Sequence, residues 1–155
     1  MKKYLLSIAV LLMATIAFTA CSNDDEPDGD NGLAKTAFTA HVSDDGSELD
    51  VTVSFVDGKT GIQYVNGVFE GDDDMKVPTE MWINFTYTMN GSKVVANPVK
   101  STIKFAGMIE VETFDDEDPT EFIYDKANKT LTVVDEDTPT VLKQTKYKEI
   151  VVPTK

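Results

Sequence analysis

Two stretches of this sequence alternate between apolar and polar residues, with Trp82 as the exception. Residues 48–55 carry apolar side chains at every second position, namely Leu49, Val51, Val53 and Phe55. Residues 81–89 repeat the pattern with Met81, Ile83, Phe85, Tyr87 and Met89. Because successive side chains of an extended chain point to opposite faces, this alternation predicts β-strands with one buried and one polar face.

The rest of the chain from residue 35 onward supports an all-β fold. Phe38, Ala40 and Val42 share one face within residues 37–42, Phe122 and Tyr124 are expected to pair with Leu131 and Val133 across a turn, and residues 140–152 are expected to close the domain. Within 102–111 we expect Ile103, Phe105, Ile109 and Val111 to face inward, with a bend or bulge at Gly107. Short segments rich in Gly, Asn and Asp, of the length found in hairpin turns, separate these runs. No segment has the caps and periodicity of a helix. The pattern predicts an antiparallel meander of eight or nine strands, either an up-and-down barrel or a two-sheet sandwich.

The charge of the chain excludes one class of partner. The 155 residues include 27 acidic residues against 14 basic ones, all of which are lysine, and the formal net charge is -13. A chain this acidic is repelled by phosphate backbones, so we expect no binding to nucleic acid. The single cysteine, Cys21, excludes an internal disulfide, so the fold depends on packing.

The first twenty residues read as an export signal. Lys2 and Lys3 precede a nearly unbroken apolar run from Tyr4 to Ala20, which ends in small residues before Cys21. This run is at the short end for a membrane-spanning helix. An uncleaved membrane anchor is the alternative, but small residues followed by a cysteine have no purpose in such a helix.

The motif "FTAC" at residues 18–21 resembles the lipobox of bacterial lipoproteins, with Phe18 in place of the usual Leu. The resemblance implies cleavage before Cys21 and acylation of that cysteine, which would tie the chain to membrane lipid. The acidic stretch after it resembles that of surface-exported lipoproteins of Bacteroidetes-type bacteria, which implies an outer-membrane protein facing outward; a simple solvated tether is the alternative. The expected organisation is a signal peptide at 1–20, a lipidated cysteine and flexible tether at 21–34, and one β domain at 35–155.

Three hairpin-like segments carry a second resemblance. "FVDGKTG" at 55–61, "FTYTMNGSKV" at 85–94 and "FIYDKANKTLTV" at 122–133 look like the small lipocalin-like lipoprotein domains of the same bacteria. The resemblance implies a lipocalin-like up-and-down barrel. An immunoglobulin-like β-sandwich is the alternative, although the Cys and Trp pairing of its true members is absent.

The residues offer little for catalysis. His41 is the only histidine, and it lies on the strand face opposite Phe38 and Val42, so we expect it to be solvated. The sequence therefore has too few histidine and cysteine residues for a zinc site or for a Ser-His or Cys-His catalytic relay. We expect no enzyme activity, no cofactor and no metal centre. Acidic loops at 70–80 and 114–121 would hold calcium only if they converged; otherwise they form an anionic surface.

The best candidate for a binding residue is Trp82. It falls on the face opposite the apolar stripe of its strand, where an aromatic side chain can stack on a sugar or anchor a protein interface, unless another segment covers it. Tyr64 and Asn66 are expected nearby on the adjoining strand. The predicted function is non-catalytic binding of a glycan, an apolar ligand or a protein partner. The alternative is an assembly subunit of a cell-surface complex, which binds no small ligand and pairs through strand edges.

Overall fold

The computed structural model describes residues 32–44, 47–70, 76–115, 117–134 and 139–154. Within these residues the chain forms nine β-strands and no helix, so none is present there that is long and apolar enough to cross a membrane. The strands are β1 (Thr36–Asp44), β2 (Ser47–Phe55), β3 (Thr60–Glu70), β4 (Lys76–Asn90), β5 (Lys93–Phe105), β6 (Met108–Thr113), β7 (Thr120–Asp125), β8 (Thr130–Val133) and β9 (Thr140–Thr145).

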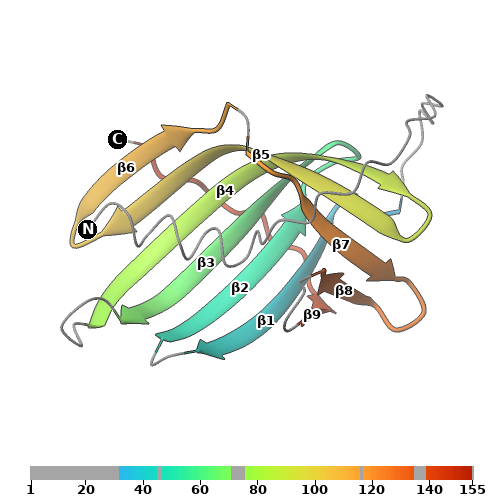
Figure 1. Ribbon diagram of the computed structural model, residues 1–155, viewed down its shortest axis with the longest axis horizontal. Coiled ribbons are helices and arrows are strands. Elements are labelled where there is room, and N and C mark those ends of the chain that lie inside the picture. Colours follow the sequence, from blue (N-terminus) through green and yellow to red (C-terminus); the bar gives the residue numbers. More distant parts are fainter. Residues whose placement is uncertain (1–31, 45–46, 71–75, 116, 135–138, 155) are drawn as a thin grey trace.

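All strands but β6 close into an antiparallel barrel (Figure 1). Each neighbours the next in the order β1–β2–β3–β4–β5–β7–β8–β9, and β9 pairs with β1 to complete the circle. The extra strand, β6, pairs with β5. The prediction of an all-β meander in a lipocalin-like up-and-down barrel is confirmed, and the chain does not form the immunoglobulin-like sandwich.

One edge of β5 is shared between two strands. Its first residues, Lys93–Ala96, pair with β7, and its last residues, Lys100–Phe105, pair with β6. Because β6 and β7 both run antiparallel to β5, they are successive parts of one strand that residues 114–119 interrupt. Only β7 pairs onward with β8. The molecule is therefore a closed barrel in one half and an open sheet, ending at β6, in the other (Figure 1).

Aromatic side chains fill the closed half of the barrel. Phe38, Phe55, Phe85, Tyr87 and Tyr124 belong to its core, and each is 8% exposed or less. The ring centroid of Phe55 lies 6.1 Å from that of Phe38, 5.9 Å from Phe85 and 4.8 Å from Tyr87, all in edge-on contact. An eight-stranded barrel has room either for its own side chains or for one small ligand, and here the aromatic side chains occupy the closed half. The interior is accordingly a packed core.

Two glycines on the inner face permit close approach. Gly61 lies directly opposite Phe85, and a Cβ at Gly61 would overlap the phenyl ring and come within 2.8 Å of the Ser54 carbonyl oxygen. At Gly67 an added Cβ would overlap the carbonyl oxygen of Glu48 in the neighbouring strand. The first conflict is mainly with a side chain and the second is with backbone, so they differ in how far they can relax.

The expected single strand through residues 102–111 is instead two strands. The chain reverses at a tight turn containing Gly107, whose φ of 80° is left-handed and suits a residue without a side chain. The β5–β6 register then places Ile109 and Val111 on the opposite face from Ile103. The prediction that Ile103, Phe105, Ile109 and Val111 all face the interior is wrong for Ile109 and Val111, because the two-residue turn after Phe105 shifts the alternation by one position.

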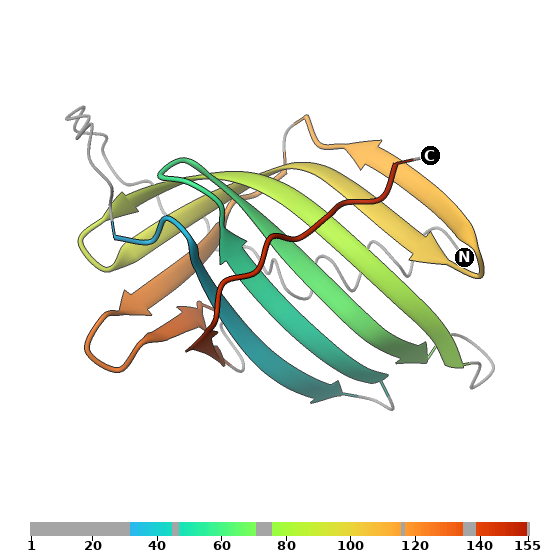
Figure 2. The same cartoon turned by 180° about the vertical axis from the view of Figure 1, so that it is seen from behind.

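The chain leaves the barrel after β9. The pairing of β9 with β1 closes the domain, as expected for residues 140–152, but only as far as Thr145. Residues 146–154, here called the C-terminal segment, form no regular structure. Figure 2 shows the C-terminal segment running diagonally across the outside of β2, β3, β4 and β5 towards β6.

Candidate functional site

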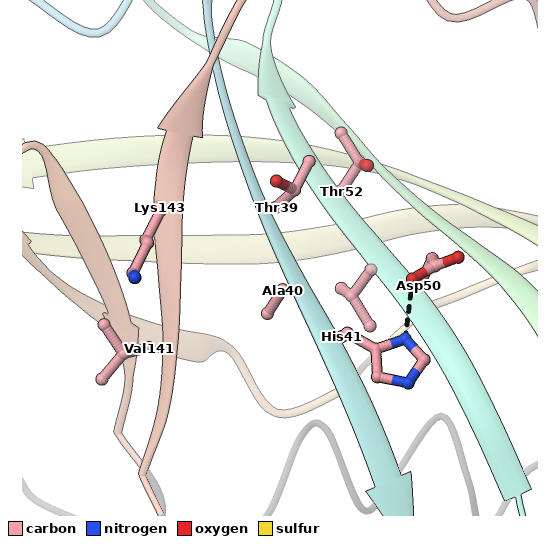
Figure 3. A pocket seen from close by; sticks show the side chains of 8 residues that line it. Thr39, Ala40, His41, Asp50, Thr52, Val141 and Lys143 are labelled. Atoms are coloured by element: carbon pink, nitrogen blue, oxygen red, sulfur yellow. Dashed lines mark hydrogen bonds and ion pairs between the residues drawn. The ribbon is translucent and has the colours of Figure 1, made fainter.

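A surface depression lies where β1 and β9 diverge. The two strands pair only at Ala37–Thr39 of β1, although β1 continues to Asp44. Beyond Thr39 the outer surface is hollowed by about 510 Å³. The depression, here called the β1–β9 depression, is lined by Thr39, Ala40, His41, Asp50, Val51, Thr52, Val141 and Lys143 (Figure 3).

The lining combines several kinds of polar group with apolar surface. Lys143 supplies a cation, Asp50 a carboxylate, and two threonines supply hydroxyls, while the Val141 side chain beside them is 50% exposed. Figure 3 shows Val141 and Lys143 on β9 facing the residues of β1 and β2 across the depression. Such a surface can hydrogen-bond a polar chain and cover part of its apolar area. It is open to solvent, so water is not excluded from a bound ligand.

The histidine of the depression is held by two carboxylates. His41 Nδ1 lies 2.9 Å from Asp50 Oδ1, and His41 Nε2 lies 2.8 Å from Glu48 Oε2. These hydrogen bonds, with Asp50 contributing more, raise the pKa of His41 above its ordinary value. The hydrogen bond that Ser43 donates to Glu48, followed by that of His41, lowers the pKa of the Glu48 carboxyl. Since both ring nitrogens are engaged, neither is positioned to act as a general base on a ligand.

Trp82 lies on the outer face of β4, directly opposite Tyr64 of β3. Their ring centroids are 5.3 Å apart with an interplanar angle of 33°. Trp82 is only 5% exposed, although it does not belong to the interior core. The two rings are therefore neighbours as expected, but the indole is almost fully removed from solvent.

A charged network borders this pair. The Tyr64 hydroxyl donates a hydrogen bond of 2.7 Å to Glu80 Oε1, and Lys104 Nζ lies 2.8 Å from Glu80 Oε2. Burial, and then the bond to Glu80, raise the pKa of Tyr64 to about 12. The lysine, and then the tyrosine, lower the pKa of the Glu80 carboxyl. Asn66 is exposed beside this network and lines a second depression of about 490 Å³ together with Glu80 and Lys104.

The structure thus brings the three predicted binding residues onto one outer face. Trp82 and Tyr64 are in ring contact, and Asn66 lies two positions along β3, opposite Glu80. Of the three, Asn66 is exposed, Tyr64 is half-buried and Trp82 is buried. Their role in binding a ligand stays a prediction.

Other expected features lie wholly or partly outside the described residues. Cys21, the signal peptide and most of the tether precede residue 32, and both acidic loops include undescribed positions. Among the residues that the structure does describe, no group of three or more His, Cys, Asp or Glu side chains is placed to hold a metal ion.

The β1–β9 depression was not anticipated from the sequence. Part of it could be predicted, because the Asp- and Gly-rich sequence at 43–48 is typical of a hairpin, and the β1–β2 register places His41 opposite Asp50. The contribution of Val141 and Lys143 depends on the closure of the barrel and carries no local signal. No protein-family model, curated protein or solved structure matches this chain.

Proposed function

We propose that this chain is a lipid-anchored protein of the outer membrane, facing outward, whose β domain binds a partner on its outer surface without transforming it. The observation that carries the proposal is the packed interior. With Phe55 and its aromatic neighbours filling the closed half of the barrel, the groups available to a partner lie on the outside.

The proposed anchoring rests on the first segment of the sequence. The apolar run up to Ala20, the small residues before Cys21 and the polar stretch after it support acylation of the cysteine thiol. Two or more acyl chains hold a protein stably at a bilayer, whereas one chain does so only marginally.

The proposal of binding without catalysis rests on the chemistry of the β1–β9 depression. His41 has no free ring nitrogen, since Asp50 and Glu48 occupy both. Lys143, the hydroxyls and the exposed Val141 instead suit a partner that presents polar groups next to apolar surface. A glycan or a protein segment fits this description. An apolar ligand inside the closed half would have to displace core aromatic side chains.

A second candidate function is favoured by the edge of β6. Among the described residues β6 pairs only with β5, so its other edge carries backbone groups that are free to pair. Met108 is 53% exposed and Val111 is 38% exposed on this strand. An open edge with exposed apolar side chains is a template for strand addition. It supports a role as an assembly subunit that pairs with another protein.

Two measurements on the native protein test the proposal. Mass spectrometry of the membrane-extracted product should show a chain that begins at acylated Cys21, and Cys21→Ser should move the protein out of the membrane fraction. An uncut leader or an unmodified thiol would remove the anchoring part.

Partner binding is tested by cross-linking on intact cells, followed by gentle detergent extraction. Lys143→Asp should abolish a cross-link made at the β1–β9 depression, whereas Val111→Pro should abolish one made at the β6 edge. Lys126→Asp, an exposed change in the β7–β8 turn, is the matched control. A glycan array probed with the same variants covers partners without amines. If neither variant changes any cross-link or glycan signal, binding through these surfaces is wrong.

A further inference from the structure

The C-terminal segment is held on the barrel in an unusual way. It lies across the outside of β2, β3, β4 and β5 (Figure 2). Yet within the described part of the chain no backbone hydrogen bond joins residues 146–154 to the sheet. A segment that lacks a hydrogen-bonded ladder is held by its side chains, and such contacts can be exchanged without unfolding the sheet.

Several residues on the outer face of the barrel are buried where this segment crosses the strands. Ala37 on β1, Ser54 on β2, Trp82 on β4 and Thr102 on β5 all project outward by their registers. Each is nevertheless 5% exposed or less. By their registers these four residues lie along a diagonal from β1 to β5. Figure 2 shows the C-terminal segment crossing the outer face of the same strands, and this crossing accounts for the burial of Trp82.

Exposed residues in the cross-strand row that contains Trp82 show how far the covered area extends. Thr39 of β1 and Val111 of β6 lie in register with Trp82, through Thr52 and Tyr64 on one side and Thr102 on the other. Both Thr39 and Val111 are exposed. The cover is thus a narrow strip along the diagonal, and the solvated surface resumes on both sides of it.

The segment presents one set of side chains to the barrel and another to solvent. Tyr147, Ile150 and Val152 are half-buried, whereas Lys148 is exposed and Val151 is 80% exposed. At its start, Lys35 Nζ lies 5.2 Å from the centroid of the Tyr147 ring. The contact with the sheet is therefore made by a few apolar anchors, as in a bound peptide.

Charge supports the same arrangement. Residues 146–155 carry Lys146, Lys148 and Lys155 against the single acid Glu149, in a chain with a net charge of -13. A cationic segment is attracted to an anionic domain.

We propose that the strip of outer face under the C-terminal segment is a peptide-binding groove, and that the C-terminal segment is its exchangeable occupant. Its ligand class is an extended, net cationic polypeptide with β-branched anchors spaced like Ile150 and Val152. The inference deepens the proposed function by naming a site and a ligand for surface binding, and it rests on that function only for its biological use. A partner segment of this chemistry binds by displacing the resident one.

The single tryptophan gives a direct readout, since Trp82 lies under the occupant and no other residue contributes indole fluorescence. In the full-length protein, the double variant Ile150→Ser with Val152→Ser should release the C-terminal segment, shift Trp82 emission to the red and increase its quenching by acrylamide. Val151→Ser is the matched control, because that side chain points to solvent. It should leave emission and quenching as in the wild type.

The probe for exchange is a synthetic peptide of residues 146–155, which contains no tryptophan. Added to the double variant, the peptide should restore the wild-type emission in a saturable manner. A scrambled peptide should not, and a peptide with Ile150→Ser should bind about tenfold more weakly because it lacks one apolar anchor. Unchanged emission in the double variant, or a shift that the peptide fails to reverse, would overturn the proposal.

If the double variant does not fold, a measurement on the wild-type protein tests the peptide-binding groove instead. Excess peptide should displace the resident segment and accelerate tryptic cleavage after Lys148 severalfold, while cleavage after Lys126 in the β7–β8 turn stays constant. Equal rates with and without the peptide would also overturn the proposal. Neither experiment uses a membrane or a cellular partner. A negative result would therefore contradict the peptide-binding groove but not the proposed function. Failure of the proposed function would likewise not contradict the groove.

Discussion

Replacement of Trp82 by alanine should destabilise the fold strongly, although the residue lies on the outer face of a strand. At 5% exposure the indole is almost fully removed from water. A buried tryptophan removes about 150–250 Å² from solvent. At about 25 cal/mol per Å² this burial contributes about 4–6 kcal/mol as an upper bound.

Two corrections adjust this figure. Alanine keeps part of the burial and the cover can partly collapse, so buried Trp→Ala changes usually cost about 3–5 kcal/mol. The ring contact with Tyr64 at 5.3 Å adds to the loss, because aromatic pairs contribute about 0.5–1.5 kcal/mol beyond their area. We therefore expect Trp82→Ala to lower the free energy of unfolding by about 3–5 kcal/mol, a large share of the roughly 5–15 kcal/mol of a typical domain.

The assay is urea unfolding followed by far-ultraviolet circular dichroism, because the variant has lost the only tryptophan fluorophore. Trp82→Phe should lose less, since it keeps an aromatic ring against Tyr64. Val141→Ala, at a side chain that is 50% exposed, should change the free energy by about 0.5 kcal/mol or less. A loss below about 1 kcal/mol for Trp82→Ala would refute the burial of the indole and, with it, the cover formed by the C-terminal segment.

Three further predictions follow from local contacts. Gly67→Ala should lower the free energy of unfolding more than Gly61→Ala in the same urea assay, because its added Cβ meets backbone, whereas a phenyl ring facing Gly61 can tilt. NMR titration should give His41 a pKa above its usual value; its contribution to stability is then complete below the unfolded pKa and disappears as pH rises through the folded value. Equal pKa values in the folded and unfolded protein would contradict this. Glu80→Gln should lower the pKa of Tyr64 from about 12, as measured by ultraviolet absorbance, and an unchanged value would assign the shift to burial alone.

Much of the fold could be predicted because the wall of a barrel is built from local alternation. The pattern at residues 48–55 matches β2, and the pattern at 81–89 lies within β4. The apolar members are buried as expected, apart from Met89, which is half-buried. The short turns then leave few ways to connect the strands. Closure into a barrel rather than a sandwich needed the β1–β9 pairing, which joins residues far apart in sequence and has no local pattern.

The candidate site was less predictable for the same reason. Alternation placed Trp82 and Tyr64 on the outer face, and the hairpin register made them neighbours. It could not reveal the cover, since the C-terminal segment contacts the sheet without strand pairing and so carries no period. The division of one strand into β6 and β7 could not be predicted either. A run of acidic residues with a proline indicates an interruption, but it does not indicate whether the next strand pairs with the same edge of β5.

The burial of Leu33 fixes the point at which the chain enters the domain. This side chain is fully buried in the core just before β1, and the Lys35 amide donates a hydrogen bond to the Phe55 carbonyl at the end of β2. A tether from Cys21 would thus enter at the pole that holds the β4–β5 and β7–β8 turns. Under the proposed acylation of Cys21, that pole would face the bilayer and the β5–β6 turn at the opposite pole would face away from it.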